Sequence, residues 1–402
     1  MNVISFIDLI REIFYKKKPD IEKIQKKGLL AVKIAQTFAL RIDFLDEHKC
    51  YELSKLFNHV EKIPSESIDK LIEKYMGQHW LERNFQSFNK ESFASASIGQ
   101  VHEGVLRSGE RVAVKIIKHN FKQRFEKDVQ SVLQLFKWII RFYPKLAKVA
   151  DPVGILNSIR AFTLDELDLR NELRNRNLLF EIWEQNRNRV DLSRLKFINI
   201  KPELTGENIM VSEYIEGETF DKLLAEKKMP YDILLELFHI HGFYIFGIGI
   251  FHGDIHPGNI ILQGQDICFV DCGAIGRVGE RLRKGLFHFM ESLSMYEFRQ
   301  CAYWLNQMSE VTLEGNSYKA YEEKLLKLYE DFENATVSQV SLTKRMMETI
   351  KLGVNSGMSF EQGMFPIIKS LMYMDGMVLR CNPQAVLMKD MRRYIEEFKR
   401  FV

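Results

Sequence analysis

Apolar residues recur every three or four positions over much of the first 90 residues, which is the spacing of an amphipathic helix. This pattern predicts helices over Val3–Tyr15, Glu22–Phe44 and Tyr51–Val60. A further helix is expected to begin at Pro64, because proline is common at the first positions of a helix. Residues 1–90 are therefore interpreted as a helical N-terminal extension.

Between Ser97 and Lys118 the pattern changes to a near alternation of apolar and polar residues, which is typical of strands. Ser108 and Gly109 supply a turn in the middle of this segment, so it is predicted to form a β-hairpin. Helical spacing then returns and further strand-like runs follow. The hairpin strands are expected at Ser97–Leu106 and Arg111–Lys118, helices at Phe121–Tyr143 and Ile155–Glu184, and strands at Leu195–Ile200 and Ile209–Tyr214.

The order of these elements predicts an α+β fold in two lobes. Residues 91–216 would form a lobe built on a small antiparallel sheet, with a helical insert at 119–160. Residues 217–402 would form a helix-rich lobe that holds one short apolar hairpin, Asn259–Val270. No internal repeat or low-complexity segment interrupts this order.

Composition and charge narrow the class of protein. Hydrophobic residues make up 46% of the chain and charged residues 28%, as in ordinary globular proteins. The net charge of +3 is too balanced to favour a nucleic-acid partner. Five scattered cysteines without a CxxC spacing favour reduced thiols in the cytoplasm. No apolar run reaches the ~18 residues of a transmembrane helix. The Val3–Tyr15 helix could lie on a membrane surface, although docking on its own domain is favoured.

The strongest chemical signal is a pair of motifs in the second lobe. Residues 252–259 have the sequence HGDIHPGN, and residues 269–273 have the sequence FVDCG. A kinase catalytic loop has the form H-x-D-x-x-x-x-N, and a D-x-G motif follows it across a hairpin. Asp254, Asn259 and Asp271 fall on these positions. A turn that contained Asp and Asn by chance would not reproduce both motifs at this spacing.

These residue types suit phosphoryl transfer. The phosphates of ATP are densely anionic and need Mg²⁺, which prefers hard oxygen ligands. Asn259 and Asp271 are predicted to hold Mg²⁺ through side-chain oxygens. Asp254 is predicted to orient the attacking hydroxyl or water and to accept its proton. His256 follows Asp254 by two residues, where kinases often place a lysine.

The first lobe carries a matching lysine and glutamate. Lys115 ends the sequence VAVK in the second strand of the hairpin. A lysine in this position contacts the α- and β-phosphates and pairs with a glutamate on a helix. Glu172, in the following helical segment, is the predicted partner. A solvated lysine at a strand end is the ordinary alternative, and the presence of Glu172 argues against it.

The strand that closes the first lobe, VSEYI, is expected to act as a hinge that binds adenine. Ser212 would be the gatekeeper residue, and the backbone of Glu213, Tyr214 and Ile215 would bind the base. This motif is weak on its own. Its place in the chain, after the lysine and glutamate and before the catalytic loop, strengthens it.

Together these motifs resemble the UbiB/AarF/ADCK family of atypical protein-kinase-like ATPases. The loop at residues 93–102 has the sequence FASASIGQVH, and this family has an alanine-rich loop where typical kinases carry a glycine-rich one. KIAQ at residues 33–36 is similar to the family's KxGQ motif, and ELD at residues 166–168 is similar to its ExD motif. The resemblance covers roughly residues 20–400. It implies a two-lobed protein-kinase-like fold that binds ATP and Mg²⁺.

The resemblance also assigns roles to residues outside the catalytic motifs. Lys33, Gln36, Glu166 and Asp168 would be regulatory residues of a helix that covers the site. Extra carboxylates near Glu172 would repel ATP, so Lys33 is predicted to neutralise Glu166. The residues expected to bind the nucleotide are Ser92, Phe93, Ala94, Ser95, Ala96, Ser97, Ile98, Gly99, Gln100, Lys115, Glu213, Tyr214 and Ile215.

Two residues depart from the family pattern. Ala35 stands where the KxGQ motif has glycine, and Cys272 stands where kinases have the phenylalanine of D-F-G. Neither change removes a charged catalytic group. The segment Arg392–Val402 is amphipathic and charged, so the membrane-spanning helices with which some family members end are expected to be absent.

The resemblance implies an atypical kinase or ATPase that supports isoprenoid-quinone (ubiquinone-type) or other lipid metabolism. It would hydrolyse ATP or phosphorylate a small molecule rather than a protein. Its partners would be a small-molecule or lipid substrate and quinone-pathway proteins, with a peripheral place on the inner face of the membrane. Two alternatives stay open: a phosphotransferase of the aminoglycoside or choline type, and a scaffold that binds nucleotide without catalysis.

Overall fold

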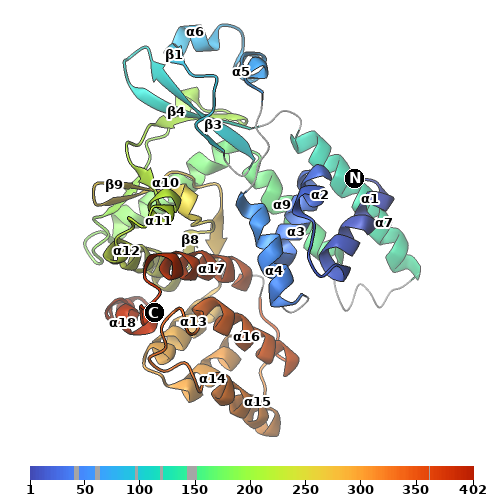
Figure 1. Cartoon of the computed structure of the whole chain (residues 1–402), viewed down its shortest axis with the longest axis vertical. Coiled ribbons are helices and arrows are strands. Elements are labelled where there is room, and N and C mark those ends of the chain that lie inside the picture. Colours follow the sequence, from blue (N-terminus) through green and yellow to red (C-terminus); the bar gives the residue numbers. More distant parts are fainter. Residues whose placement is uncertain (40–44, 59–63, 96–97, 118–120, 143–151, 362) are drawn as a thin grey trace. The chain divides into compact units, whose positions relative to one another are not determined.

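The chain divides into two compact units (Figure 1). The first comprises Met1–Arg174 and Asn199–Tyr214, and the second comprises Asn175–Ile198 and Ile215–Val402. Residues 175–198 group with the second unit, although we expected them in the first lobe. The computed structural model describes residues 1–39, 45–58, 64–95, 98–117, 121–142, 152–361 and 363–402.

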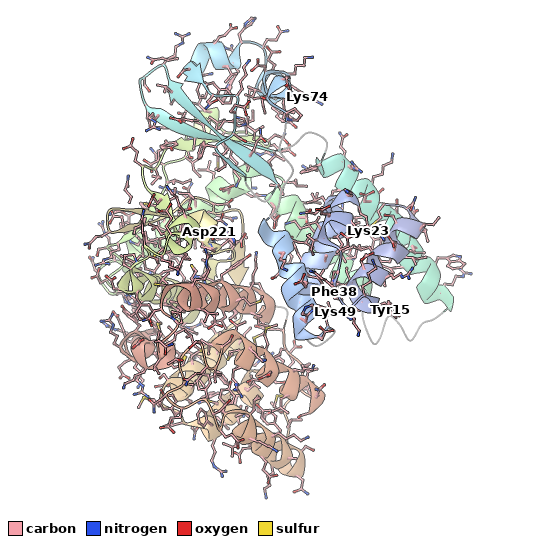
Figure 2. All side chains as sticks on the ribbon, in the orientation of Figure 1. Tyr15, Lys23, Phe38, Lys49, Lys74 and Asp221 are labelled. Atoms are coloured by element: carbon pink, nitrogen blue, oxygen red, sulfur yellow. The ribbon has the colours of Figure 1, made fainter. Side chains whose placement is uncertain are left out.

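An N-terminal bundle of helices forms one part of the first unit (Figure 1). Its apolar faces meet in a core that includes Leu9, Ile34 and Val129, so the predicted insert packs on the N-terminal extension. Figure 2 labels Phe38 and Lys49 in this bundle. Phe14 and Phe38 meet edge to face with ring centroids 4.9 Å apart, and Lys49 donates to Phe14 O at 2.8 Å. The helices are α1 (Val3–Ile10), α2 (Ile21–Lys26), α3 (Leu29–Ala39), α4 (Glu47–Ser54), α7 (Phe121–Phe142) and α9 (Pro152–Glu166), with a π-helical turn at Arg11–Tyr15 and a 3₁₀ turn at Lys55–Asn58.

Two of the long helices predicted in the first unit are broken. The segment Glu22–Phe44 is interrupted at Gly28, whose φ of +99° lies in a region that L side chains rarely adopt. Helix α2 therefore ends at Lys26 and α3 begins at Leu29. Phe44 lies outside the described residues.

The second break divides the segment predicted as one helix, Ile155–Glu184. Helix α9 ends at Glu166, and α10 (Leu169–Asn186) begins three residues later. Leu169 N donates to Glu207 O at 2.9 Å, which fixes the start of α10. Residues 169–174 of α10 belong to the first unit and its remainder to the second.

The sheet of the first unit has the strand order β1-β3-β4-β6, with β2 added against β3. The predicted hairpin is present as β3 and β4, which are antiparallel. Residues 1–90 are not all helical as predicted, because β1 pairs with β3 and extends the sheet. Ile68 and Trp80 pack on this sheet from two short helices. The elements are β1 (Phe85–Phe88), β2 (Ala94–Ser95), β3 (Gly99–Leu106), β4 (Arg111–Ile117), β6 (Ile209–Glu213), α5 (Ile68–Met76), α6 (Trp80–Asn84) and 3₁₀ turns at Ser65–Ser67 and Pro202–Leu204.

The second unit contains a sheet with the order β5-β10-β9-β7 and a separate pair, β8 with β11. The predicted apolar hairpin is present as β9 and β10. The segment predicted as the strand Leu195–Ile200 contributes β5, which lies parallel to β10. The strands are β5 (Leu195–Phe197), β7 (Glu218–Thr219), β8 (Ile250–His252), β9 (Ile260–Gln263), β10 (Asp266–Phe269) and β11 (Ile275–Arg277).

Helices make up most of the second unit (Figure 1). Helix α18 shows why they pack: Met391, Ile395 and Phe398 share one buried face. Within the described part of the chain, no helix is both long and apolar enough to span a membrane. The helices are α11 (Phe220–Ala225), α12 (Tyr231–Gly242), α13 (Glu280–Ser294), α14 (Phe298–Met308), α15 (Gly315–Leu328), α16 (Leu342–Asn355), α17 (Met364–Cys381) and α18 (Leu387–Phe398), with π-helical Phe243–Ile248 and 3₁₀ turns at Pro257–Asn259 and Lys399–Phe401.

Candidate active site

Lys115 and Glu172 form a buried ion pair in the first unit. Lys115 lies in β4, opposite Val101 of β3 and Met210 of β6. Its Nζ lies 2.7 Å from Glu172 Oε2, and the two side chains are only 8% and 2% exposed. Glu172 stands in the first turn of α10, where the helix dipole favours a carboxylate. The partnership expected from the sequence is therefore present in the structure.

A second ion pair joins Lys33 of α3 to Glu166 at the end of α9. These side chains are 13% and 25% exposed, so the pair is less enclosed than the first. Gln36 lies on the same helix and donates from Nε2 to Leu56 O at 3.0 Å, so it ties α3 to the 3₁₀ turn after α4. Ala35 is fully buried in the bundle core. The predicted contact between Lys33 and Glu166 is thus present, whereas Gln36 has a different partner.

Asp168 lies between α9 and α10 and is bound to Arg170. Its carboxylate accepts hydrogen bonds from Arg170 N at 3.1 Å, from Nε at 2.8 Å and from Nη2 at 2.7 Å. The hydrogen bond from the Arg170 side chain holds the pKa of Asp168 below its ordinary value, against the opposing effect of burial. Arg170 therefore neutralises Asp168, and Lys33 neutralises Glu166 but not Asp168.

The alanine-rich loop joins the sheet through β2. Phe93 N donates to Val101 O at 3.0 Å, while Ala94 and Ser95 pair with β3. Ala96 and Ser97 lie outside the described residues, and Ser92 precedes the strand. Ile98 is buried.

Two residues at the end of this loop are constrained by the sheet. A Cβ at Gly99 would lie 2.2 Å from Ile116 O, so only glycine fits there. The side chain of Gln100 is buried and its Nε2 donates to His102 Nε2 at 2.9 Å. Any contact of Gln100 with a nucleotide would therefore come from its backbone.

The predicted hinge is already engaged in strand pairing. Glu213 N donates to Asn199 O at 2.9 Å, and Tyr214 N donates to Arg111 O at 3.2 Å. The guanidinium of Arg111 also stacks 4.2 Å from the centre of the Tyr214 ring. Adenine recognition by Glu213 and Tyr214 would therefore fall to their carbonyl oxygens. Ser212 is buried in β6, and Ile215 belongs to the second unit.

In the second unit, His252 joins the two catalytic motifs. Its Nε2 lies 2.5 Å from Asp271 O, and its Nδ1 accepts a hydrogen bond from Asp254 N at 3.1 Å. Burial lowers the pKa of His252, so the ring is neutral at pH 7. A neutral ring that accepts at Nδ1 carries its proton on Nε2, which donates to the carbonyl. One buried histidine thus fixes the backbone of Asp254 to that of Asp271.

The residues predicted to hold Mg²⁺ are oriented by their own hydrogen bonds. Asn259 donates from Nδ2 to Asp254 O at 3.0 Å, which leaves its Oδ1 as the acceptor end of the amide. Asp271 Oδ1 accepts from Gly273 N at 2.8 Å. Among the described residues no cluster of three or more His, Cys, Asp or Glu could hold a metal alone. The Asn259 amide and the Asp271 carboxylate suit Mg²⁺, because in nucleotide sites this ion has few protein ligands and is otherwise coordinated by phosphate and water oxygens.

Comparison with known proteins identifies the family. Residues 55–304, more than half of the chain, match the model of the ABC1 atypical kinase-like domain. This chain belongs to the ABC1 atypical kinase-like family. The resemblance inferred from its motifs is thereby confirmed.

The relatives of this ABC1-family chain are distant in sequence. A probable protein kinase UbiB from Sodalis glossinidius is 25% identical over 93% of this chain and 69% of its own length. The Arabidopsis thaliana chloroplastic protein ACTIVITY OF BC1 COMPLEX KINASE 8 is 28% identical over 66% of this chain and 35% of its own. A solved complex of Rv3197 with erythromycin from Mycobacterium tuberculosis aligns with a TM-score of 0.51 and 17% identity, covering 96% of this chain and 92% of that one. The predicted α+β, two-lobed kinase-like fold is confirmed.

One charged residue at the catalytic loop was not found from the sequence. Lys369 of α17 places its Nζ 2.9 Å from Asp254 Oδ1. Burial alone would raise the pKa of Asp254, but the positive charge of Lys369 outweighs it and holds this pKa below its ordinary value. Tyr373, one turn along α17, meets the His256 ring edge to face with centroids 5.2 Å apart. No motif marks Lys369, because it lies 115 residues from Asp254 in the chain.

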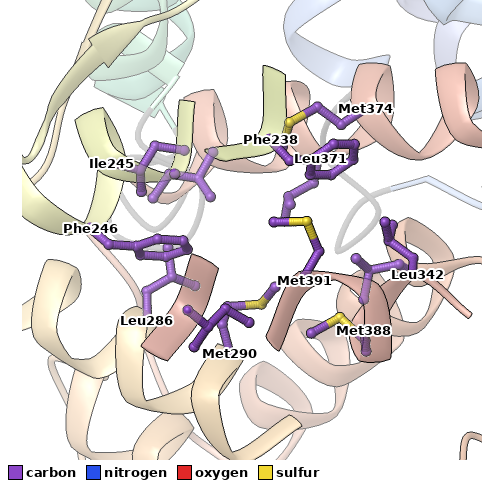
Figure 3. Close-up of a pocket in the computed structure, with 14 residues that line it drawn as sticks. Phe238, Ile245, Phe246, Leu286, Met290, Leu342, Leu371, Met374, Met388 and Met391 are labelled. Carbon is purple, nitrogen blue, oxygen red and sulfur yellow. The ribbon is translucent and has the colours of Figure 1, made fainter. Parts of the chain in front are cut away.

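The other face of α17 borders an apolar cavity of about 40 Å³ (Figure 3). Leu371 and Met374 line it from α17, and Met388 and Met391 line it from α18. A lipid tail is much larger than this volume, so the cavity is a packing gap in the methionine-rich core. Helix α17 therefore carries an apolar side toward the core and a polar side toward the catalytic loop.

Proposed function

We propose that this chain binds MgATP and either hydrolyses it or transfers its γ-phosphoryl group to a small-molecule or lipid acceptor. The observation that carries this proposal is that the His252 ring makes hydrogen bonds to the backbone of both Asp254 and Asp271. These hydrogen bonds hold Asp254 and Asp271 in one fixed arrangement. Asp254 would orient the nucleophile, and Asp271 would bind the metal. Phosphoryl transfer depends mainly on such positioning and on charge stabilisation.

Each residue has a distinct part in the proposed reaction. Asn259 and Asp271 would hold Mg²⁺, which neutralises the phosphate oxygens when bound. Lys115, kept in place by Glu172, would orient the α- and β-phosphates. Asp254 would accept a hydrogen bond from the attacking hydroxyl or water and then take its proton.

The proposed acceptor is a small molecule or lipid rather than a protein. The ion pair between Lys33 and Glu166 ties α3 to the end of α9, close in sequence to Glu172, and supports a covering role for this helix. Relatives named UbiB support a link to isoprenoid-quinone or other lipid metabolism, with quinone-pathway proteins as partners.

The first helix supports a peripheral place on a membrane. Helix α1 docks through Phe6 and Leu9 but exposes Ile4 and Ile7 on its other side. An apolar helix face of this kind can enter the headgroup region of a bilayer, and Lys16 and its neighbours add positive charge beside it. Flotation with anionic liposomes should recover the wild-type chain, and an Ile4→Asp/Ile7→Asp variant should lose this association.

The deciding experiment measures ATP turnover with and without Mg²⁺, anionic liposomes and a panel of phenolic quinone precursors. Mg²⁺-dependent hydrolysis that liposomes or precursors stimulate is the expected result. Turnover that strictly requires a hydroxylated small molecule unrelated to quinones would favour the aminoglycoside- or choline-type phosphotransferase. MgATP binding without turnover under any of these conditions would favour the scaffold.

A further inference from the structure

The contact between α17 and the catalytic loop places an ammonium group at the carboxylate proposed to orient the nucleophile. Lys369 Nζ lies 2.9 Å from Asp254 Oδ1, and the two side chains are 18% and 25% exposed. They are therefore only partly enclosed, unlike Lys115 and Glu172. Asp254 Oδ1 itself is buried, so the exposed area of the pair lies on its other atoms. A pair that stays partly accessible in this way can contact a ligand as well as its partner.

Distance limits show how near this ammonium lies to the proposed reaction. A nucleophile activated by Asp254 lies within about 3 Å of its carboxylate. The phosphorus atom that it attacks lies roughly 3–3.5 Å further on. The transferring group is therefore within roughly 6 Å of Asp254. The flexible four-carbon stem of Lys369 can move its ammonium group over such a distance.

The catalytic loop itself does not supply a cation at this point. His256 occupies the position two residues after Asp254, and its Nδ1 accepts a hydrogen bond, as the ring nitrogen of a neutral histidine does. Its Nδ1 is occupied by a hydrogen bond from Gly258 N at 3.0 Å. His256 thus shapes the loop, whereas a transferring phosphoryl group needs positive charge nearby.

We propose that Lys369 is a further catalytic residue, whose ammonium group stabilises the negative charge on the transferring phosphoryl group beside Asp254. This inference rests on the proposed function. In the step, a bond forms between the acceptor oxygen and phosphorus while the bond from phosphorus to the β-phosphate oxygen breaks, and ADP leaves with the bonding electron pair. The acceptor proton passes to Asp254. Lys369 stays protonated and contributes only charge and hydrogen bonds.

The test compares Lys369→Met with wild type in three measurements: ATP turnover, the rise in melting temperature caused by MgADP, and the melting temperature without nucleotide. We expect kcat to fall about 10²-fold or more, as for the loss of one transition-state donor. The KM for ATP and the MgADP-induced shift should remain close to wild type. Lys369→Arg should keep part of the activity, because it retains the charge. Lys389→Met, at an exposed lysine of α18, is the matched control and should behave as wild type.

A relocation variant makes the test specific to charge rather than to packing. Adding His256→Lys to Lys369→Met returns a cation to the loop itself, and we expect at least tenfold recovery of kcat. The inference is overturned if Lys369→Met equals or exceeds wild type, because the lysine would then be idle or would block the site. It is equally overturned if activity falls together with melting temperature and neither Lys369→Arg nor the relocation variant recovers it.

Failure of the proposed function gives a different result. In that case wild type itself shows no Mg²⁺-dependent turnover, and Asp271→Asn leaves the MgADP-induced shift unchanged. The inference about Lys369 then falls with the function on which it rests. An active wild type with an unaffected Lys369→Met rejects the inference about Lys369 alone.

Discussion

The two ion pairs at the proposed catalytic residues differ in how they are enclosed and in how far apart their members lie in the chain. Lys115 and Glu172 are 57 residues apart and almost fully buried. Lys369 and Asp254 are 115 residues apart and partly exposed. A buried pair leaves an uncompensated charge in a low-dielectric interior when one partner is removed, whereas water can solvate the survivor of a partly exposed pair. The first pair should therefore contribute to stability and to turnover, and the second mainly to turnover.

The largest expected effect is that of Lys115→Met. This variant should lose about 10²–10³-fold in ATP turnover, because the phosphates lose their fixed cation. It should also lose about 3–5 kcal/mol of unfolding free energy, since Glu172 would remain charged and buried without its partner. Denaturant unfolding and ATP turnover measure the two effects separately.

The matched control restores the charge balance without restoring the cation. Lys115→Met/Glu172→Gln should recover part of the lost stability but none of the turnover. Lys369→Met should lose much less stability than Lys115→Met. Equal losses of stability in the two lysine variants would contradict the distinction drawn between the pairs.

Asp271→Asn tests the metal-binding part of the second unit. Replacing the carboxylate with an isosteric amide should cost on the order of several kcal/mol of MgADP affinity, because a hard anionic ligand of Mg²⁺ is lost. The rise in melting temperature caused by ADP should then no longer depend on Mg²⁺. Asp266→Asn, in the same hairpin, is the control and should keep the wild-type response. An unchanged response in Asp271→Asn would remove Asp271 from the metal site.

The contrast between the pairs also explains what the sequence could predict. Lys115 was found because it ends the VAVK sequence in a strand with a regular alternation of apolar residues. Asp254, Asn259 and Asp271 were found because two motifs at kinase spacing stand on either side of one short hairpin. Local patterns of this kind fix both structure and chemistry. Lys369 belongs to a helix whose opposite face packs in the core, and only the tertiary fold brings it to Asp254.

The errors in secondary structure have local causes. The strand β1 has only four residues and follows directly on α6, so its FQSF sequence carried no distinct strand signal. It exists because Phe85 packs against Gly104, where a Cβ would come within 2.9 Å of the ring. The break at Gly28 was hidden because apolar residues keep helical spacing on both sides of it.

The pair of Lys33 and Glu166 is less buried than Lys115 and Glu172 but more buried than the surface pair of Lys90 and Asp69. Its coupling energy should therefore also be intermediate. A double-mutant cycle with Lys33→Ala and Glu166→Ala should give a coupling energy of about 0.5–1 kcal/mol in MgADP affinity or unfolding free energy. The exposed pair of Lys90 and Asp69 in the same unit is the control, and its cycle should be close to additive. Strict additivity for Lys33 and Glu166 would mean that this contact does not stabilise the covering helix.

The smallest expected effect concerns an ion-pair network on the N-terminal bundle. Its Lys23 and Asp8 are 40% and 30% exposed, and its buried Glu12 also pairs with Lys16. Lys23, which Figure 2 labels, places its Nζ 2.8 Å from both Asp8 Oδ1 and Glu12 Oε1. Hydrogen bonds from Lys23 and Lys27 lower the pKa of Asp8 to about 2. A carboxyl group whose pKa is lowered by folding stabilises the folded state when the pH is above its pKa in the unfolded chain. This contribution disappears as the pH falls through its pKa in the folded protein. Wild type should therefore melt a few degrees above Lys23→Met at pH 7, and the difference should shrink from about pH 4 and vanish only below about pH 2. The control Lys17→Met, at an exposed lysine nearby, should match wild type throughout. A difference that persisted unchanged at pH 2 would show that Lys23 stabilises the bundle through packing of its stem rather than through charge.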